Sequence, residues 1–405
     1  MRAVPADRDS IAISRRSALG VLGIAAAGLG LSGCSEPAAP DDTPQRVVAP
    51  PPDGVLGANF NGDPSRVSFA ELQDVSATWL RGFFPMPQAD QGAVADAPVI
   101  RMLTTAVGNG YGTVLSLKFP YNRDPMPAPG TPDMATALRR LDAVLPAVLG
   151  TVDILVIGNE PFIECRDQDR DERLNVFYEA VARHVIDYRA RKCGAGCKTQ
   201  LYLGALNHLD RPDWRTAATA RWLTYTHDTP ELSGVDIHPT SPPPGDDQAF
   251  LDYVLPKLRA DQKFLATEFS LVLLWKQHLK EPVDPRFAAR YGVPRATMVW
   301  QLVRDAAETP FSQQKWDDFL GLSPWFQNHH EFLSNQLTRF RATSRLAVAT
   351  YGITQDSAMV HDFGPDSTPW LFTSVFCPLV VVPAPSGLPG RTTAWADEFR
   401  RLQQR

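Results

Sequence analysis

The sequence predicts an α/β fold built from repeated strand-helix units, and three observations point to it. Short apolar runs that end at glycine, proline or a polar residue alternate with segments of helical periodicity. Each step from one strand to the next takes about 30 to 50 residues, which suits a right-handed βαβ crossover. No glycine-rich phosphate loop follows the first strand, which disfavours a nucleotide-binding protein. The pattern leaves two architectures, a barrel or an open doubly wound sheet.

Eight segments have the length and composition of buried parallel strands. In chain order they are residues 54–62, 76–85, 112–120, the run 154–157 within the stretch 151–164, and residues 199–207, 234–239, 263–271 and 345–353. A further apolar run, residues 369–383, competes with residues 345–353 for the place of the eighth strand.

Helical periodicity is clearest in the segments between and after these strands, namely residues 133–149, 173–192, 219–229, 249–260 and 393–404. The chain departs from the compact pattern after the seventh strand, where residues 272–344 are mostly polar and aromatic with helical stretches. This segment is much longer than an ordinary connection. We expect it to form a helical insertion over the carboxyl ends of the strands.

Two acidic residues end apolar runs in the same manner. Asn159-Glu160-Pro161 follows the run 154–157, and Glu268 follows the strand that starts at Lys263. A proline restricts the residue before it to extended backbone, so we expect Glu160 to project from the end of its strand. Carboxyl ends of parallel strands carry the functional groups of such folds.

The order and spacing of Asn159-Glu160-Pro161 and Glu268 resemble the retaining glycoside hydrolases of clan A. The resemblance implies a (β/α)8 TIM barrel with a long insertion after strand 7, and a β-linked oligo- or polysaccharide as substrate. Glu160, after the fourth strand, would be the acid/base, and Glu268, after the seventh, the nucleophile. Retention requires the two carboxyl groups to lie about 5 to 5.5 Å apart. The resemblance implies no cofactor and no metal.

The same resemblance assigns supporting roles. Asn159 would bind the 2-hydroxyl of the sugar, and Arg81 would keep the nucleophile ionised through its positive charge. His238 stands where the clan often has a polar residue near the nucleophile. Thr240 stands where an aromatic hydroxyl is common, so the resemblance does not say what orients Glu268.

Asn207 and His208 stand at the end of the fifth strand, where they could face the same mouth. We expect Asn207 to be a substrate-binding residue. Trp275, Trp316 and Trp325 lie in the insertion and could form part of a sugar platform, although tryptophans of this kind more often pack the interior.

Structural roles remain open for the acidic and basic candidates. Glu160 could cap a helix or pair with an arginine, Glu268 could form a structural ion pair, Arg81 could lie at the surface, and His238 could be a structural histidine. On that reading the chain is a catalytically silent carbohydrate-binding or cell-envelope lipoprotein. A serine hydrolase is disfavoured because no Gly-x-Ser-x-Gly occurs, and a metal hydrolase because no His-Glu-x-x-His occurs.

The N-terminus has the features of an export signal. Residues 14–19, SRRSAL, resemble a twin-arginine motif, although Ala18 stands where a bulkier apolar residue is usual. Leu31-Ser32-Gly33-Cys34 resembles a bacterial lipoprotein cleavage box; a plain signal peptide or an uncleaved anchor is the alternative. We therefore expect residues 1–33 to be a signal peptide, Cys34 to carry lipid, and the Pro/Ala-rich residues 34–53 to be a tether.

The mature protein would then be residues 34–405, with a single barrel over residues 54–405. We expect it to be lipid-anchored outside the cytoplasm and to be a monomer, with a carbohydrate as its substrate. The chain has 405 residues and a formal charge of −5. The leader contributes four arginines and two aspartates, so its removal lowers the charge from −5 to −7. An acidic chain without a basic stripe is not expected to bind nucleic acid. Four cysteines remain after Cys34, and an exported protein favours disulfides, with three pairings possible among Cys165, Cys193, Cys197 and Cys377.

Overall fold

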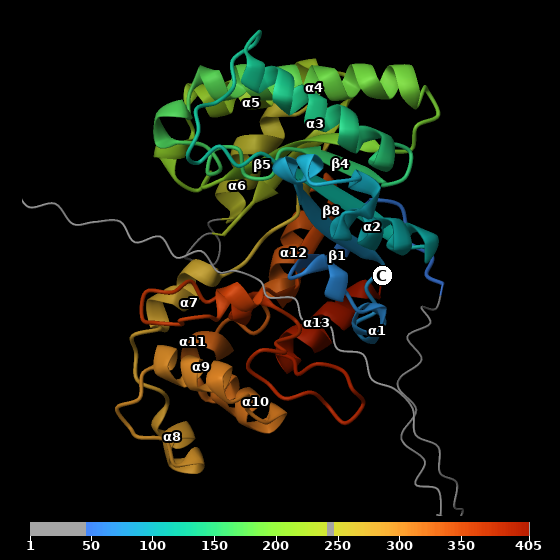
Figure 1. The fold of residues 1–405 in the computed structure, drawn as a ribbon. Helices are drawn as coiled ribbons and strands as arrows, with labels where there is room; N and C mark the ends of the chain where they lie inside the picture. Colours follow the sequence, from blue (N-terminus) through green and yellow to red (C-terminus); the bar gives the residue numbers. More distant parts are fainter. Residues whose placement is uncertain (1–45, 241–246, 405) are drawn as a thin grey trace, which may run out of the picture. The chain divides into compact units, whose positions relative to one another are not determined.

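The computed structural model describes residues 46–240 and 247–404, and within these residues eight parallel strands close into a barrel in sequence order (Figure 1). The strands are β1 Val55–Asn61, β2 Trp79–Pro85, β3 Gly112–Lys118, β4 Ile154–Ile157, β5 Gln200–Asn207, β6 Leu232–His238, β7 Lys263–Ala266 and β8 Leu346–Gln355. The predicted (β/α)8 fold is confirmed. Each strand overlaps its predicted segment, because the apolar runs that face both the barrel interior and the helices are easily recognised in the sequence.

The eighth strand is formed from the segment 345–353, as placed from the sequence, and the competing run 369–383 is not a barrel strand. That run contains the short 3-10 helix η8, Trp370–Thr373. It meets β8 through a bridge between Gly352 and Ser374 and through the Phe376 N–H, which donates to the Ile353 carbonyl at 2.8 Å.

One prediction about a strand end needs correction. The seventh strand ends at Ala266 rather than Leu271, because the chain leaves the barrel beyond Glu268 and enters the insertion. The first helix of that insertion, α7, begins at Val272.

Helices pack around the barrel wherever the sequence has helical periodicity. They are α1 Phe69–Asp74, α2 Pro98–Gly108, α3 Pro132–Val148, α4 Glu172–Lys192, α5 Ala217–Asp228, α6 Asp247–Val254, α12 Phe332–Ala342 and α13 Thr393–Gln403. The side chains fall into two cores. One fills the barrel interior around Trp79, Tyr202 and Leu265, and the other lies between the strands and the helices.

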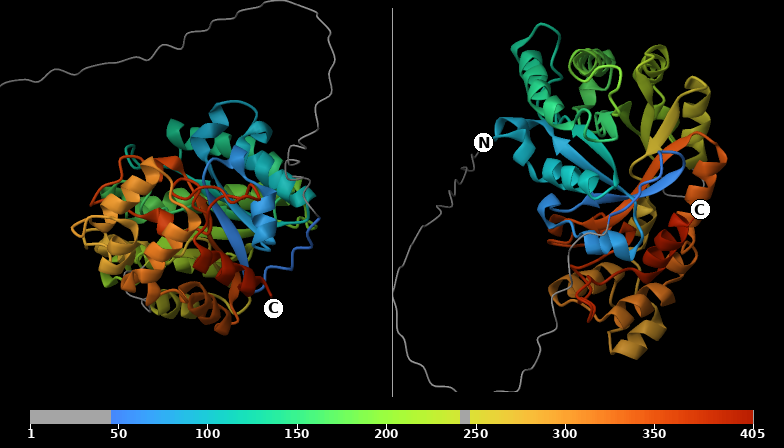
Figure 2. Two further views of the ribbon diagram at one scale, coloured as in Figure 1. Left: turned by 90° about the horizontal axis from the view of Figure 1, so that it is seen from below. Right: turned by 90° about the vertical axis from the view of Figure 1, so that its right-hand side faces the viewer.

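The insertion after β7 is helical, as predicted. It contains α7 Val272–His278, α8 Pro285–Tyr291, α9 Val299–Glu308, α10 Gln313–Leu322 and α11 Pro324–Gln327. These helices (gold to orange) gather on the side of the strands opposite to α3 and α4 (Figures 1 and 2). The predicted boundary at residue 344 was too late, because α12 packs its Phe340 against Phe264 of β7 and so belongs to the barrel layer.

The residues before β1 pack against the amino-terminal ends of the strands. The N–H of Val47 donates to the carbonyl of Asn109 at 2.7 Å, and the Trp79 indole N–H donates to the carbonyl of Pro50 at 2.9 Å. The last part of the expected tether is therefore part of the folded unit. The predicted signal peptide, residues 1–33, and the predicted lipidation site Cys34 lie outside the described residues.

One disulfide joins Cys193 and Cys197 at the end of α4. Cys165 and Cys377, the other two candidates, are buried and unpaired among the described residues, so the expected second disulfide is absent there. Within residues 46–240 and 247–404, no helix is long and apolar enough to cross a membrane.

Candidate active site

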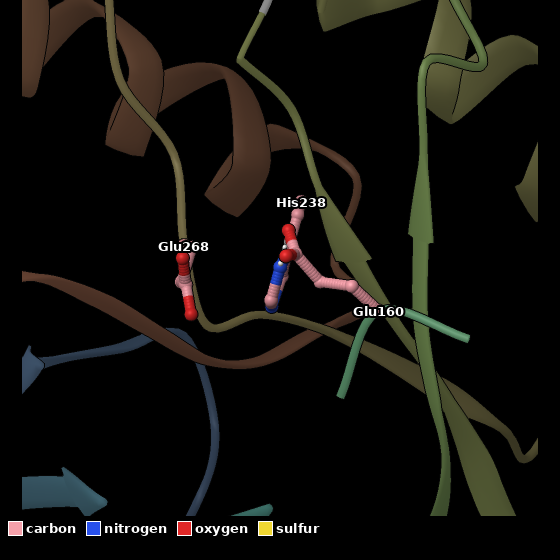
Figure 3. A group of neighbouring side chains, drawn as sticks. All are labelled: Glu160, His238 and Glu268. Atoms are coloured by element: carbon pink, nitrogen blue, oxygen red, sulfur yellow. Dashed lines mark hydrogen bonds and ion pairs between the residues drawn. The ribbon is translucent and has the colours of Figure 1, made fainter. Parts of the chain in front are cut away.

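Glu160, His238 and Glu268 meet at the carboxyl ends of β4, β6 and β7 (Figure 3). Their side chains point toward one another, and one ligand-type atom of each lies within 4.8 Å of the others. Parallel strands in a closed barrel bring residues far apart in sequence to a single mouth. The two glutamates that the sequence singled out therefore share one site.

The backbone before Glu160 depends on close contact between two glycines. Gly158 follows β4 and has a φ of +103°, a conformation that favours glycine. A Cβ on Gly204 of β5 would stand 2.6 Å from the carbonyl carbon of Gly158. The chain bends at Asn159 and Glu160 instead of continuing as a strand, and a turn follows in which the carbonyl of Glu160 accepts the N–H of Ile163 at 2.9 Å.

Glu160 receives two hydrogen bonds on one oxygen. The Nδ2 of Asn207 donates to Oε1 at 2.7 Å, and Nδ1 of His238 lies 3.0 Å from the same atom. Burial acts to raise the pKa of Glu160, but the hydrogen bond and charge of His238, with the hydrogen bond of Asn207, outweigh it and lower this pKa to about 2.

His238 is fully buried, and its second ring nitrogen, Nε2, is also hydrogen-bonded. Nε2 lies 2.9 Å from Oγ1 of Thr267, and the Thr267 hydroxyl donates to Asp236 Oδ2 at 2.5 Å. The Thr267 hydroxyl has a single proton and donates it to Asp236, so His238 Nε2 must donate to Thr267 Oγ1. One further proton then lies between His238 Nδ1 and Glu160 Oε1.

The negative charges around His238 favour its protonated form. Burial acts to lower the pKa of His238, whereas the carboxylates of Glu268, Asp236 and Glu160 around the ring raise it to about 10. The shared proton therefore rests on the imidazole, and Glu160 is the carboxylate of a partly buried ion pair.

Arg81 binds the other glutamate. This fully buried guanidinium donates from Nη1 to Glu268 Oε1 at 2.5 Å and to Asn59 Oδ1 at 3.0 Å. Nη2 donates to Asn159 Oδ1 at 2.6 Å, and Nε donates to Ser116 Oγ at 3.2 Å. The neutral oxygens of Asn59, Ser116 and Asn159 thus hold the planar guanidinium of Arg81 in place. Among the residues that the structure describes, Glu268 is the one carboxylate that it contacts, so the positive charge is directed at Glu268.

The predicted site residues thus fall into two groups. Asn207 and His238 contact Glu160, while Arg81 and Asn159 lie on the side of Glu268. His238 was expected to serve the nucleophile, but its direct hydrogen bond is to Glu160.

The tryptophans of the insertion pack its interior, which was the favoured interpretation, and do not form a sugar platform. Trp275, Trp316 and Trp325 are 1%, 0% and 8% exposed. Trp275 packs against Trp325, and Trp316 stacks on Phe372. His208 packs on Trp214, with the two ring centroids 4.5 Å apart.

The sequence reading missed five residues of this mouth: Asn59, Phe83, Ser116, Lys118 and Glu164. A signal for three of them existed, because side chains alternate along a strand. Once Arg81 points inward on β2, the half-buried Phe83 must do so as well, and its ring lies 5.6 Å from the Lys118 ammonium on β3. Ser116 shares the inward row with Lys118. No comparable rule reaches Glu164, which lies in the turn after Glu160.

The cluster also has the composition of a metal site, with one histidine and two carboxylates. The donor set does not fit a cation well, because Arg81 already places a positive charge 2.5 Å from Glu268 and His238 pairs directly with Glu160. The arrangement suits two carboxylates with separate partners.

The fold and the site together define a (β/α)8-barrel protein with a pair of carboxylates at the carboxyl ends of its strands. Among solved structures, the chain is similar to Gas2p of Saccharomyces cerevisiae in complex with laminaritetraose and laminaripentaose, with 9% identity and a TM-score of 0.44 over 86% of this chain and 62% of that chain. The apo structure of Gas2p gives 9% identity and a TM-score of 0.44 over 86% of this chain and 60% of that chain. The chain thus spans less than two thirds of the length of these structures. No protein-family model and no curated protein matches the sequence.

Proposed function

We propose that the chain is a retaining glycoside hydrolase that acts on a β-linked oligo- or polysaccharide. The observation that carries this proposal is the separation of the two carboxylates, with oxygens of Glu160 and Glu268 within 4.8 Å. Retaining enzymes need about 5 to 5.5 Å between the two groups, whereas inverting enzymes need about 6.5 to 9.5 Å to admit a water.

The first step forms a glycosyl-enzyme. The Glu268 carboxylate attacks the anomeric carbon, the bond from that carbon to the leaving oxygen breaks, and Glu160 gives its proton to the leaving oxygen. Arg81 positions Glu268 for this attack through the ion pair between its Nη1 and Glu268 Oε1 at 2.5 Å. In the second step water attacks the anomeric carbon, Glu160 accepts the water's proton, and the bond to Glu268 breaks.

The pair of Glu160 and His238 supplies the acid. Glu160 is held ionised, but His238 Nδ1 lies 3.0 Å from Glu160 Oε1 and holds a proton in the hydrogen bond between these two atoms. When a leaving oxygen approaches Glu160, transfer of that proton along the hydrogen bond makes the carboxylic acid. In the second step the proton taken from water returns to the imidazole, so the pair ends the cycle as it began it.

The test is hydrolysis by the protein of aryl β-glycosides and β-linked polysaccharides, with Glu160→Ala and Glu268→Ala beside it. We expect the parent to release sugar with the anomeric configuration retained, as read by NMR at early times, and each variant to lose at least about a thousandfold in kcat/KM. Saccharide binding without hydrolysis would favour a carbohydrate-binding lipoprotein instead. Activity that survives loss of Glu268 would exclude it as the nucleophile.

The export signal supports a second, separate proposal. We propose that the protein is lipid-anchored through Cys34 outside the cytoplasm, because residues 31–34 have the form of a lipoprotein cleavage box. Radiolabelled palmitate should enter the parent and not Cys34→Ala in the producing cell. Equal labelling of the two would refute the anchor.

A further inference from the structure

Glu164 is a third carboxylate at the mouth, and nothing in the proposed reaction yet uses it. It lies four residues after Glu160, in the turn where its N–H donates to the Glu160 carbonyl at 2.8 Å. Its side chain is 5% exposed and turns back toward the strands. A buried carboxylate so close to the reacting pair is costly unless it has partners.

One oxygen of Glu164 has two partners. Oε1 accepts from Asn159 Nδ2 at 2.8 Å and lies 2.8 Å from the Lys118 ammonium. The other oxygen, Oε2, is buried and has no hydrogen-bond partner among the described residues. Burial raises the pKa of Glu164, while Lys118 and Asn159 act in the opposite direction.

These contacts determine which way the Asn159 amide faces. Arg81 can only donate, and it donates to Oδ1 of Asn159 at 2.6 Å. Ionised Glu164 can only accept, so it takes a proton of the Asn159 amino group. Because the two neighbours demand opposite ends of the amide, a flipped Asn159 would lose both hydrogen bonds.

The amino group of Asn159 has two protons, and Glu164 accepts one of them. The second has no acceptor among the described residues. The amide is 3% exposed, so this proton can be satisfied only by a group that enters the mouth. The ring hydroxyl beside the anomeric carbon is the group that Asn159 would meet in the proposed function.

We propose that Glu164 is a positioning residue that holds the Asn159 amide so that its spare N–H faces the sugar hydroxyl at C2. The same amide ties Glu164 to Arg81, and through it to Glu268, in one hydrogen-bonded chain. The inference rests on the proposed function and deepens it, because it makes a free C2 hydroxyl the feature of the substrate that Glu164 serves. An ion pair with Lys118 alone would have no such consequence.

The test compares an aryl glycoside that the parent hydrolyses with its 2-deoxy analogue. Glu164→Met removes the acceptor at similar volume, and Glu164→Gln keeps an oxygen that can still accept. We expect Glu164→Met to lower kcat/KM about tenfold on the full sugar and at most about twofold on the 2-deoxy sugar, with partial rescue in Glu164→Gln. The loss on the full sugar should disappear when Asn159→Ala is already present.

A matched control comes from α4. Glu179 on α4 forms its ion pair with Arg221 of α5 at 2.7 Å and is not one of the residues that contact Glu160 or Glu268. Glu179→Gln should therefore leave the preference for the full sugar unchanged. Thermal melting checks that each variant folds, and Glu164→Gln carries the comparison if Glu164→Met does not. Equal losses on both sugars, or losses that add to those of Asn159→Ala, would overturn the inference and leave the hydrolase standing. A parent that hydrolyses no glycoside would overturn the proposed function first.

Discussion

At the scale of single residues, the site is defined by which partner each carboxylate has. Glu268 faces a guanidinium that cannot give up its proton. Glu160 faces an imidazole that can. The two glutamates are the same amino acid, and their neighbours give one the character of a nucleophile and the other that of an acid/base.

His238 should therefore determine how activity falls at high pH. In the parent, the proton shared by His238 and Glu160 is lost as pH rises through the pKa of His238, which is about 10. In His238→Gln the cation is gone and Glu160 alone must hold the proton, with the pKa of a buried carboxylic acid. We expect the alkaline limb of kcat/KM to move down by at least about two pH units.

The control for that profile is His184→Gln on α4. His184 also pairs with a carboxylate, Asp142, at 2.7 Å, but away from the mouth. His184→Gln should shift neither the acidic nor the alkaline limb of the pH profile of kcat/KM. An unchanged alkaline limb in His238→Gln would contradict the shared proton.

At the scale of elements, the close approach of β4 and β5 sets the position of Glu160. A Cβ on Gly204 would meet only backbone atoms of the preceding strand, at 2.6 to 2.7 Å. Backbone cannot move aside as a flexible side chain can. The two strands must separate to accept any larger residue.

We expect Gly204→Ala to lower the free energy of unfolding by about 1–3 kcal/mol through this overpacking. Activity of the folded fraction should fall as well, because Glu160 and Asn207 end the two strands that separate. Chemical denaturation and kcat measure the two effects. Gly321→Ala on α10 is the control, because a Cβ there meets no atom within 4 Å, and it should be neutral or slightly stabilising. An equal loss of unfolding free energy in both variants would refute the steric argument.

The disulfide is the second feature at this scale. Cys193 and Cys197 are only four positions apart, so their bond removes little freedom from the unfolded chain. The chain-entropy relation gives about 2 kcal/mol for so short a loop. The double variant Cys193→Ser/Cys197→Ser should lose about that much in urea denaturation and keep its kcat; loss of activity at full folding would mean that the loop supports the site.

At the scale of the whole molecule, the partly buried ion pair should shape stability against pH. The pKa of Glu160 falls from its ordinary 4.5 to about 2, so its contribution is complete above pH 4.5 and is lost as pH falls toward 2. The pKa of His238 rises from 6.5 to about 10, so its contribution is complete below pH 6.5 and is lost as pH rises through 10. Both are present together between pH 4.5 and 6.5.

We expect Tm to be highest in that interval and to fall on either side. His238→Gln should flatten the decline between pH 7 and 10, because no imidazole then loses a proton there. Calorimetry from about pH 3 to 11 on both proteins measures this. An alkaline decline of the same slope in His238→Gln would assign it to other groups.

The sequence alone identified Glu160, Glu268, Arg81 and the barrel, but it paired His238 with the wrong glutamate. Asn159, Glu160 and Glu268 were found because each follows an apolar run, and such runs are visible in any window of the chain. For the tryptophans of the insertion the sequence left both a sugar platform and interior packing open, because exposure is not a local property. Their burial follows from how the helices of the insertion pack on one another.

By itself the sequence determined where strands end and which side chains stand at those ends, since glycine, proline and apolar periodicity act on the nearest few residues. Only the tertiary structure decided that His238 serves Glu160, which lies 78 positions away, and that Glu164 turns back to Asn159. Closing a barrel brings eight strand ends to one mouth, and the choice of partners there depends on strand register and on distances of a few ångströms. Those quantities belong to the assembled fold and to no segment of the chain.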